Sequence, residues 1–117
     1  GGGPTVVEGL TYRVPPHIPA DTEEYLKNFV YPEKGAAEYM VEQDISCFAI
    51  DALSADKPGA ALEDHHVHYT LLPEDILIIE GVANLGSVEA GRYDVICTPI
   101  PYQDRDGSQV RLLVRPK

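Results

Sequence analysis

Residues 64–80 read DHHVHYTLLPEDILIIE, and this segment contains signals for a short helix, a chain reversal and a strand. The first nine residues, 64–72, can form a helix of about two turns, which Pro73 ends because proline disfavours helix in the residue before it. Residues 76–79 are four large aliphatic side chains, the pattern of a buried strand. This strand runs directly into Glu80, so a carboxylate follows a strongly apolar run.

The segments on either side of 64–80 extend the same alternation of helix and strand. Upstream, residues 35–43 carry an apolar helical face, and residues 45–50 form an apolar run typical of a strand covered on both sides. Residues 51–64 are rich in turn formers and predict a loop. Downstream, residues 93–101 and 109–114 are β-rich, and the Asp-Gly pair in the intervening 103–108 segment indicates a hairpin.

The N-terminal part begins with an extended, proline-rich entry segment, residues 1–19, which contains a strand at residues 10–14. A capped amphipathic helix then begins at Asp21 and ends before Pro32. We find no internal repeat and no linker that would divide the chain. The sequence therefore predicts a single domain, 1–117, of the α/β class, with a mixed sheet and short helices in residues 20–117.

Composition and charge narrow the classes of function. The chain has 117 residues, of which 44% are hydrophobic and 24% charged, the ordinary range for one globular domain. Its formal charge of −10 disfavours binding to nucleic acid and to anionic membrane surfaces, because phosphate groups would be repelled. No segment has the apolar length of a membrane helix, and the N-terminus lacks the pattern of a signal peptide.

The two cysteines, Cys47 and Cys97, each lie in an apolar run. We expect buried thiols rather than a disulfide, which favours the cytoplasm as the location.

One group of residues has the composition of a metal site. His65, His66 and His68 lie within four positions, and Glu80 follows twelve positions after His68. Imidazole and carboxylate are the usual protein ligands of zinc, manganese and iron. If the helix and the strand lie antiparallel, His68 and Glu80 project into one space, and the desolvated Glu80 carboxylate needs a cation or several donors. The alternative is a strand-end glutamate bonded to water or loop amides, beside surface histidines.

At these residues the sequence resembles the metal-dependent hydrolases of the cyclase, or kynurenine formamidase-like, family. Three stretches are similar to family patterns and occur in the family's order: HYTLL at 68–72 followed by ILIIEGVANL at 76–85, AIDALSAD at 49–56, and DGSQVR at 106–111. The family has glycine where this chain has Ala49 and proline where it has Gln109. The resemblance extends from about residue 35 to the C-terminus and corresponds to the C-terminal half of the family pattern.

The resemblance implies the C-terminal part of a swivelling β/β/α fold and a hydrolase of amide, cyclic amide or lactone bonds in a small-molecule substrate. It also implies one or two divalent metals, zinc or manganese, which activate water and polarise the carbonyl. In that family a histidine and a glutamate that match His68 and Glu80 are metal ligands. Asp51 and Asp56 then become candidates for orienting those ligands, although acids in such loops are often simple caps.

The family's remaining ligands and its acid/base histidine lie in a first-half motif, His-x-Gly-Thr-His-x-Asp-x-Pro, which this sequence lacks. His17 stands alone among prolines and does not replace it. Three alternatives remain open: His65 or His66 is recruited, a second polypeptide supplies the missing ligands, or the site is vestigial. We therefore expect either half of a hydrolase that is completed by a complementary chain or by a missing N-terminal segment, or a degenerate, non-catalytic module. Both would form oligomers.

Overall fold

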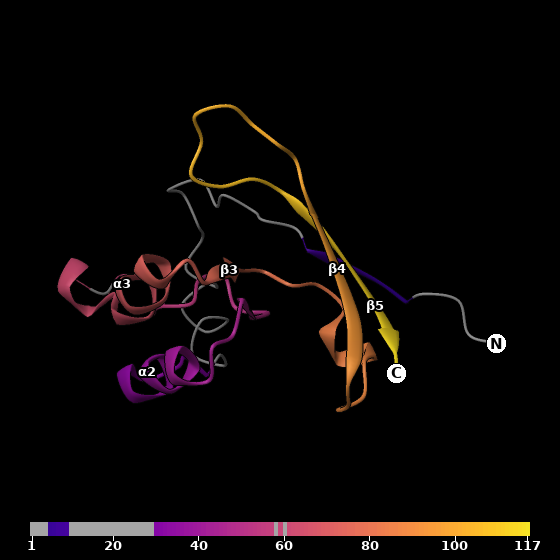
Figure 1. Cartoon of the computed structure of the whole chain (residues 1–117), viewed down its shortest axis with the longest axis horizontal. Helices are drawn as coiled ribbons and strands as arrows, with labels where there is room; N and C mark the ends of the chain where they lie inside the picture. Colours follow the sequence, from indigo (N-terminus) through magenta and orange to yellow (C-terminus); the bar gives the residue numbers. More distant parts are fainter. Residues whose placement is uncertain (1–4, 10–29, 58, 60) are drawn as a thin grey trace.

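The computed structural model describes residues 5–9, 30–57, 59 and 61–117. It contains two helices, α2 (Lys34–Glu42) and α3 (His66–Leu71), in the described residues. The strands in these ranges are β1 (Thr5–Gly9), β2 (Cys47–Ala49), β3 (Leu77–Ile79), β4 (Tyr93–Pro99) and β5 (Val110–Pro116). Figure 1 shows the two helices at one end of the molecule, β4 and β5 at the other, and β3 between them.

The strands form two small sheets. One has the order β1-β5-β4 and is antiparallel, with β5 in the centre. The other is a parallel pair, β2 and β3, in which Cys47 lies opposite Leu77 and Ala49 opposite Ile79. Helix α3 lies between these two strands in the chain, so the sequence from β2 to β3 forms a small β-α-β unit.

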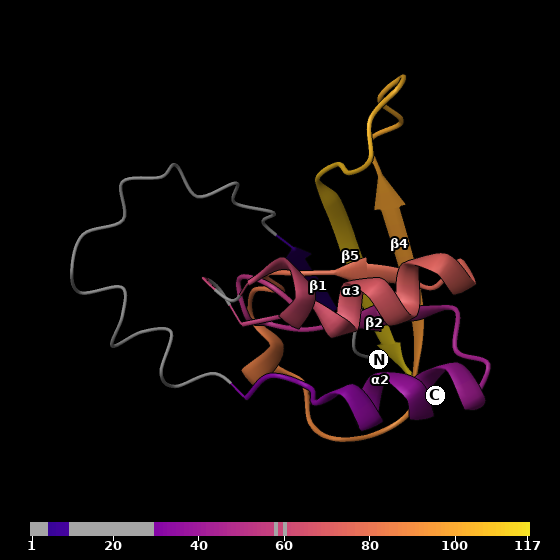
Figure 2. The ribbon, with the colours of Figure 1, turned by 90° about the vertical axis from the view of Figure 1, so that its left-hand side faces the viewer.

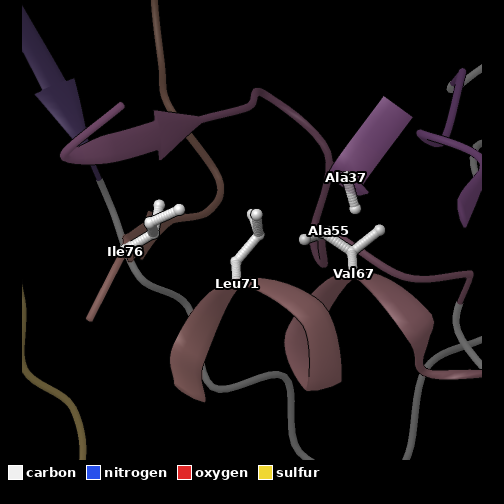
Figure 3. Packing of buried hydrophobic residues seen from close by; sticks show 5 residues of the cluster. All are labelled: Ala37, Ala55, Val67, Leu71 and Ile76. Carbon is white, nitrogen blue, oxygen red and sulfur yellow. The ribbon is translucent and has the colours of Figure 1, made fainter. Parts of the chain in front are cut away.

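Two hydrophobic clusters hold these elements together. The first joins the helices to the parallel pair and consists of Ala37, Ala55, Val67, Leu71 and Ile76. Figure 3 shows Val67 and Leu71 of α3 directed toward Ala37 of α2 and toward Ala55. The second cluster joins the two sheets and consists of Ile79, Val82, Leu112 and Val114. In Figure 2, viewed from the helical end, α2 and α3 lie in front of the strands.

The structure confirms most of the predicted elements in the described residues. The helix predicted at 35–43 is α2, and the helix predicted at 64–72 is α3 preceded and followed by short 3-10 turns, Leu62–Asp64 and Leu72–Glu74. The predicted hairpin is the antiparallel β4–β5 pair, although its connection is a longer loop in which Asp104, not Gly107, has a positive φ. Strand β1 at 5–9 was not predicted. The predicted strand at 10–14 lies outside the described residues, as does nearly all of the helix predicted between Asp21 and Pro32.

The predicted burial of both cysteines was wrong. Cys47 and Cys97 are free and exposed. The reason is that β2 is not covered on both sides: Phe48 packs against the helical cluster, whereas Cys47 and Ala49 point to the opposite, exposed face. An apolar run predicts that a strand will be covered but does not reveal whether the covering element belongs to the same chain.

No helix in the described part of the chain is sufficiently long and apolar to cross a membrane.

Candidate functional site

Three polar side chains, Asp56, His68 and Glu80, meet where the parallel strands end. Asp56 lies in the loop after β2, His68 lies in α3, and Glu80 directly follows β3. Because β2 and β3 are parallel, their carboxyl ends lie at the same edge of the sheet. The loop that follows β2 folds back on this edge, where the Gly81 N–H donates a hydrogen bond to the carbonyl of Ala52 in that loop at 2.8 Å.

Asp56 is the most buried charged residue of this group, with an exposed fraction of 2%. Its Oδ1 accepts a hydrogen bond from the backbone N–H of Val67 at 2.9 Å, and its Oδ2 accepts one from the backbone N–H of His68 at 3.0 Å. These N–H groups belong to the first turn of α3 and have no partner within the helix. Asp56 therefore fixes the position of α3 from a distant point in the sequence.

The imidazole of His68 lies between the two carboxylates. Its Nδ1 is 2.6 Å from Asp56 Oδ2, and its Nε2 is 3.3 Å from Glu80 Oε1. A carboxylate cannot donate, so Nδ1 carries the proton and donates to Asp56. The other ring nitrogen, Nε2, is thereby directed toward Glu80.

Glu80 is held by the same loop that carries Asp56. Its Oε1 accepts a hydrogen bond from the backbone N–H of Ala55 at 2.7 Å, and its carboxylate also accepts one from the Ser54 side chain. Ser54 Oγ in turn accepts a hydrogen bond from Asp56 N–H at 3.3 Å. A partly buried carboxylate needs donors of this kind, and the loop supplies them.

The charges of the three side chains stabilise one another. The hydrogen bond with Glu80 raises the pKa of His68, burial lowers it, and the bond with Asp56 raises it further, to about 9. Burial raises the pKa of Asp56 and of Glu80, but their hydrogen bonds, those from His68 foremost, outweigh burial and hold both values below the ordinary range. Without a bound metal, His68 is therefore an imidazolium between two carboxylates at neutral pH.

The other candidate residues take no part in this trio. The His65 ring centroid lies 6.2 Å from that of His68, and His66 Nε2 lies 3.1 Å from the Pro32 carbonyl oxygen. Asp51 is exposed. In the described ranges, no cluster of three or more His, Cys, Asp or Glu side chains has an arrangement that would hold a metal ion.

The distance between His68 Nε2 and Glu80 Oε1 fits two ligand atoms of one zinc ion. Zinc–nitrogen and zinc–oxygen bonds of about 2.0–2.2 Å at a tetrahedral angle separate the two ligand atoms by about 3.4 Å. The observed distance between His68 Nε2 and Glu80 Oε1 is 3.3 Å. The imidazole also has a carboxylate on its other nitrogen, as metal-bound histidines usually do. Two ligands are one fewer than a catalytic zinc site needs.

Sequence reasoning named His68, Glu80 and Asp56, but it assigned no role to Ser54 or to the Ala55 amide. Ser54 lies in the AIDALSAD segment, two positions before Asp56, and this spacing was the available signal. The contribution of Ala55 is a backbone N–H, which any residue other than proline would provide, so the sequence contains no signal for it.

Comparison with known proteins shows the relationship of the chain. It is 32% identical over 112 residues to the kynurenine formamidase of Bacillus cereus and 31% identical over 112 residues to that of Bacillus anthracis. Each match covers 94% of this chain and 50% of the relative. The chain is a partial homologue of the kynurenine formamidase and cyclase-family hydrolases. It spans about half the length of the curated relatives it matches.

A solved structure shares this fold. It is described as a potential metal-dependent hydrolase with cyclase activity, and it matches with a TM-score of 0.65 and 32% sequence identity. The match covers 74% of this chain and 41% of that structure. No family model matches the chain. The resemblance indicated by the three sequence stretches is thus confirmed, over 50% of the length of the first relative and 41% of that of the solved structure.

Proposed function

We propose that this chain is the C-terminal half of a metal-dependent hydrolase that acts on an amide, cyclic amide or lactone bond in a small molecule. The observation that carries the proposal is the orientation of His68, whose Nδ1 is held by buried Asp56 while Nε2 lies 3.3 Å from Glu80. This arrangement presents one imidazole nitrogen and one carboxylate oxygen to the same point. It is supported by the kinship with kynurenine formamidases and with a potential metal-dependent hydrolase.

Each residue has a distinct role in this proposal. His68 and Glu80 hold a divalent metal, zinc or manganese. Asp56 keeps the proton on Nδ1 and fixes the plane of the ring, and Ser54 and the Ala55 amide orient the Glu80 carboxylate. When bound, the metal would activate water and polarise the carbonyl of the substrate.

Because this chain offers two adjacent ligands, we infer that a complementary polypeptide, or an N-terminal segment that this sequence does not include, provides the others and the acid/base histidine. That polypeptide or segment would carry the His-x-Gly-Thr-His-x-Asp-x-Pro motif of the family's first half. Because the match spans half the length of the relatives, we place the missing ligands in the part of the family's length that lies outside the matched region. We also place the protein in the cytoplasm, since exposed free thiols persist in a reducing compartment.

One observation favours a second candidate, a non-catalytic module that keeps the fold without the metal. Both carboxylates already have a cationic partner without a metal, because the imidazolium of His68 lies between them and its pKa is raised to about 9. In this reading the trio stabilises the loop and α3, and the protein serves for subunit contact or small-molecule binding.

Metal content separates the two functions. The chain is purified with zinc in the buffer, alone and in complex with the part of Bacillus cereus kynurenine formamidase that it does not match, and zinc is measured by mass spectrometry. The hydrolase proposal predicts stoichiometric zinc in the complex, lost in His68→Ala and Glu80→Gln. His66→Ala is the matched control and retains zinc, because His66 faces Pro32. A complex without zinc would favour the non-catalytic module.

A further inference from the structure

Two free thiols, Cys47 and Cys97, have no role in the candidate site. They are the two cysteines of the chain and lie fifty positions apart in the sequence. Cys47 is the first residue of β2, and Cys97 lies within β4. These strands belong to different sheets, so whether the thiols meet depends on which faces the two sheets turn toward each other.

Cys47 lies on the face of the parallel pair that is turned away from the helices. Side chains alternate between the two faces along a strand, and paired residues of neighbouring strands share a face. Because Ala49 pairs with Ile79, Cys47 is on the same face as Ile79. Phe48 and Ile78, on the opposite face, pack against the helical cluster, whereas Ile79 belongs to the cluster that joins the two sheets. Cys47 is therefore directed toward the antiparallel sheet.

Cys97 lies on the side of the antiparallel sheet that faces the parallel pair. It pairs with Leu112, which is buried in the same inter-sheet cluster as Ile79. Tyr93, four positions earlier in β4 and hence on the same face, also packs against that cluster. Both thiols are thus directed into the space between the two sheets.

The electrostatics of Cys47 agree with this placement. Burial raises the pKa of the Cys47 thiol, and the negative charge of a Cys97 thiolate raises it further. A Coulomb interaction weakens with distance, so its presence indicates that the two sulfur atoms lie near each other. Both cysteines are also exposed, which makes them accessible to a reagent in solution.

The surroundings of the thiols favour redox chemistry over metal binding. Among the described residues, no group of three or more His, Cys, Asp or Glu side chains could hold a metal ion, so no third ligand joins the two thiols. A disulfide needs only the pair, with Cα atoms about 4.4–6.8 Å apart. Cys47 starts its strand and follows a bend at Ser46, a position where the backbone can adjust to this geometry without breaking the centre of the ladder.

We propose that Cys47 and Cys97 form an oxidation site at which a low-molecular-weight disulfide, such as glutathione disulfide, introduces a covalent bond between the two sheets. One protein thiolate attacks glutathione disulfide, forms a mixed disulfide and releases one glutathione. The second protein thiolate attacks the protein sulfur of the mixed disulfide, forms the Cys47–Cys97 bond and releases the second glutathione. Two protein thiols are oxidised and one glutathione disulfide is reduced, and the departing thiolates take up the two protons.

The bond would fix the sheet that leads to the candidate site. β2 continues into the loop that carries Asp56, whereas β4 belongs to the antiparallel sheet, so oxidation would tie the two sheets together. Closing a loop of fifty residues also restricts the unfolded chain, which predicts a higher unfolding temperature for the oxidised protein. The inference is independent of the proposed function and applies equally to a hydrolase half and to a non-catalytic module.

Oxidation in glutathione buffers tests the proposal on the full chain without metal or partner. The original chain, Cys47→Ser and Cys97→Ser are incubated with defined ratios of glutathione and glutathione disulfide, both folded and unfolded in urea. Free thiols are then alkylated, and mass spectrometry of the intact chain and of its peptides separates the internal disulfide from mixed disulfides. The unfolded chain is the reference, because its two thiols meet only by random loop closure.

We expect the internal disulfide to form in the folded chain with an effective concentration at least about tenfold above that in urea. Oxidation should raise the unfolding temperature by about 5–15 °C, and dithiothreitol should reverse the increase. Each serine variant should stop at a mixed disulfide with glutathione and show no such increase. Equal effective concentrations in the folded and unfolded chain, mixed disulfides on both cysteines, or disulfides between two copies would each overturn the proposal.

Discussion

At the scale of single residues, Asp56 connects the fold to the candidate chemistry. Its carboxylate accepts two backbone N–H groups from α3 and contacts the imidazole of His68. The same contacts thus satisfy the first turn of α3 and orient the imidazole so that Nε2 faces Glu80. Ser54 and Ala55 extend this network to Glu80 from the same loop.

Replacing Asp56 with alanine should lower the stability of the protein substantially. The variant leaves two helix N–H groups and an imidazolium without their acceptor, and breaking a buried pair costs about 3–5 kcal/mol. Urea denaturation measures the free energy of unfolding. Asp51→Ala is the control, since Asp51 is exposed, and should change stability by less than about 0.5 kcal/mol. Equal losses of unfolding free energy in the two variants would contradict the role of Asp56 in holding α3 and His68.

Stability of the metal-free chain should depend on pH in two directions. His68 has a pKa raised from 6.5 to about 9, so its contribution is complete below pH 6.5 and is lost as pH rises toward 9. Asp56 and Glu80 have lowered pKa values, so their contribution is present above their ordinary values of 3.8 and 4.5 and is lost in acid. Urea denaturation from pH 3 to 10 should show the maximum at about pH 5–6.5. In His68→Gln the decline between pH 6.5 and 9 should disappear, and a decline that persists within this interval would refute the assignment.

At the scale of elements, the sequence of a single segment was sufficient to predict a helix or strand where that segment determines its own structure. Pro73 predicted the end of α3 and the chain reversal, and the aliphatic run at 76–79 predicted β3. These elements place His68 in the helix and Glu80 directly after the strand. The role of Asp56 needed a contact across eleven residues to Val67, which its own neighbours do not encode. The exposure of Cys47 and Cys97 depends on which elements cover β2 and β4, and the sequence of the strands themselves does not indicate this.

Adjacent leucines at the end of α3 should differ sharply in their effect on stability. Leu71 is fully buried in the cluster between the helices and the parallel pair, whereas Leu72 is 50% exposed. Leu71→Ala should therefore cost about 2–5 kcal/mol, because it removes buried contacts and leaves a cavity. Leu72→Ala should cost less than about 1 kcal/mol. Thermal and urea unfolding of both variants provide the comparison, and similar losses would contradict the packing of α3.

At the scale of the whole molecule, the two sheets meet through a small core that leaves one apolar face uncovered. Ile79, Val82, Leu112 and Val114 form this contact, while Leu77 and Val95 continue it into solvent. Leu77 belongs to β3, the strand that leads directly into Glu80.

Metal affinity of the assembled complex should increase with pH. Zinc must displace the proton from Nε2 of His68, which the two carboxylates hold with a pKa of about 9 in the metal-free chain. Calorimetric zinc titrations between pH 6 and 9 should therefore show progressively tighter binding and fewer protons released per zinc. Affinity that does not change over this range would contradict direct ligation by His68.

The most direct measurement follows the imidazole nitrogens of His68 by NMR in the nitrogen-15-labelled chain within the assembled complex. On addition of zinc, the Nε2 resonance of His68 should move to the range of a metal-bound nitrogen, while Nδ1 keeps its proton and its bond to Asp56. The resonances of His66 should remain unchanged. An unshifted Nε2 of His68 in a complex that holds zinc would contradict the claim that this residue is a ligand.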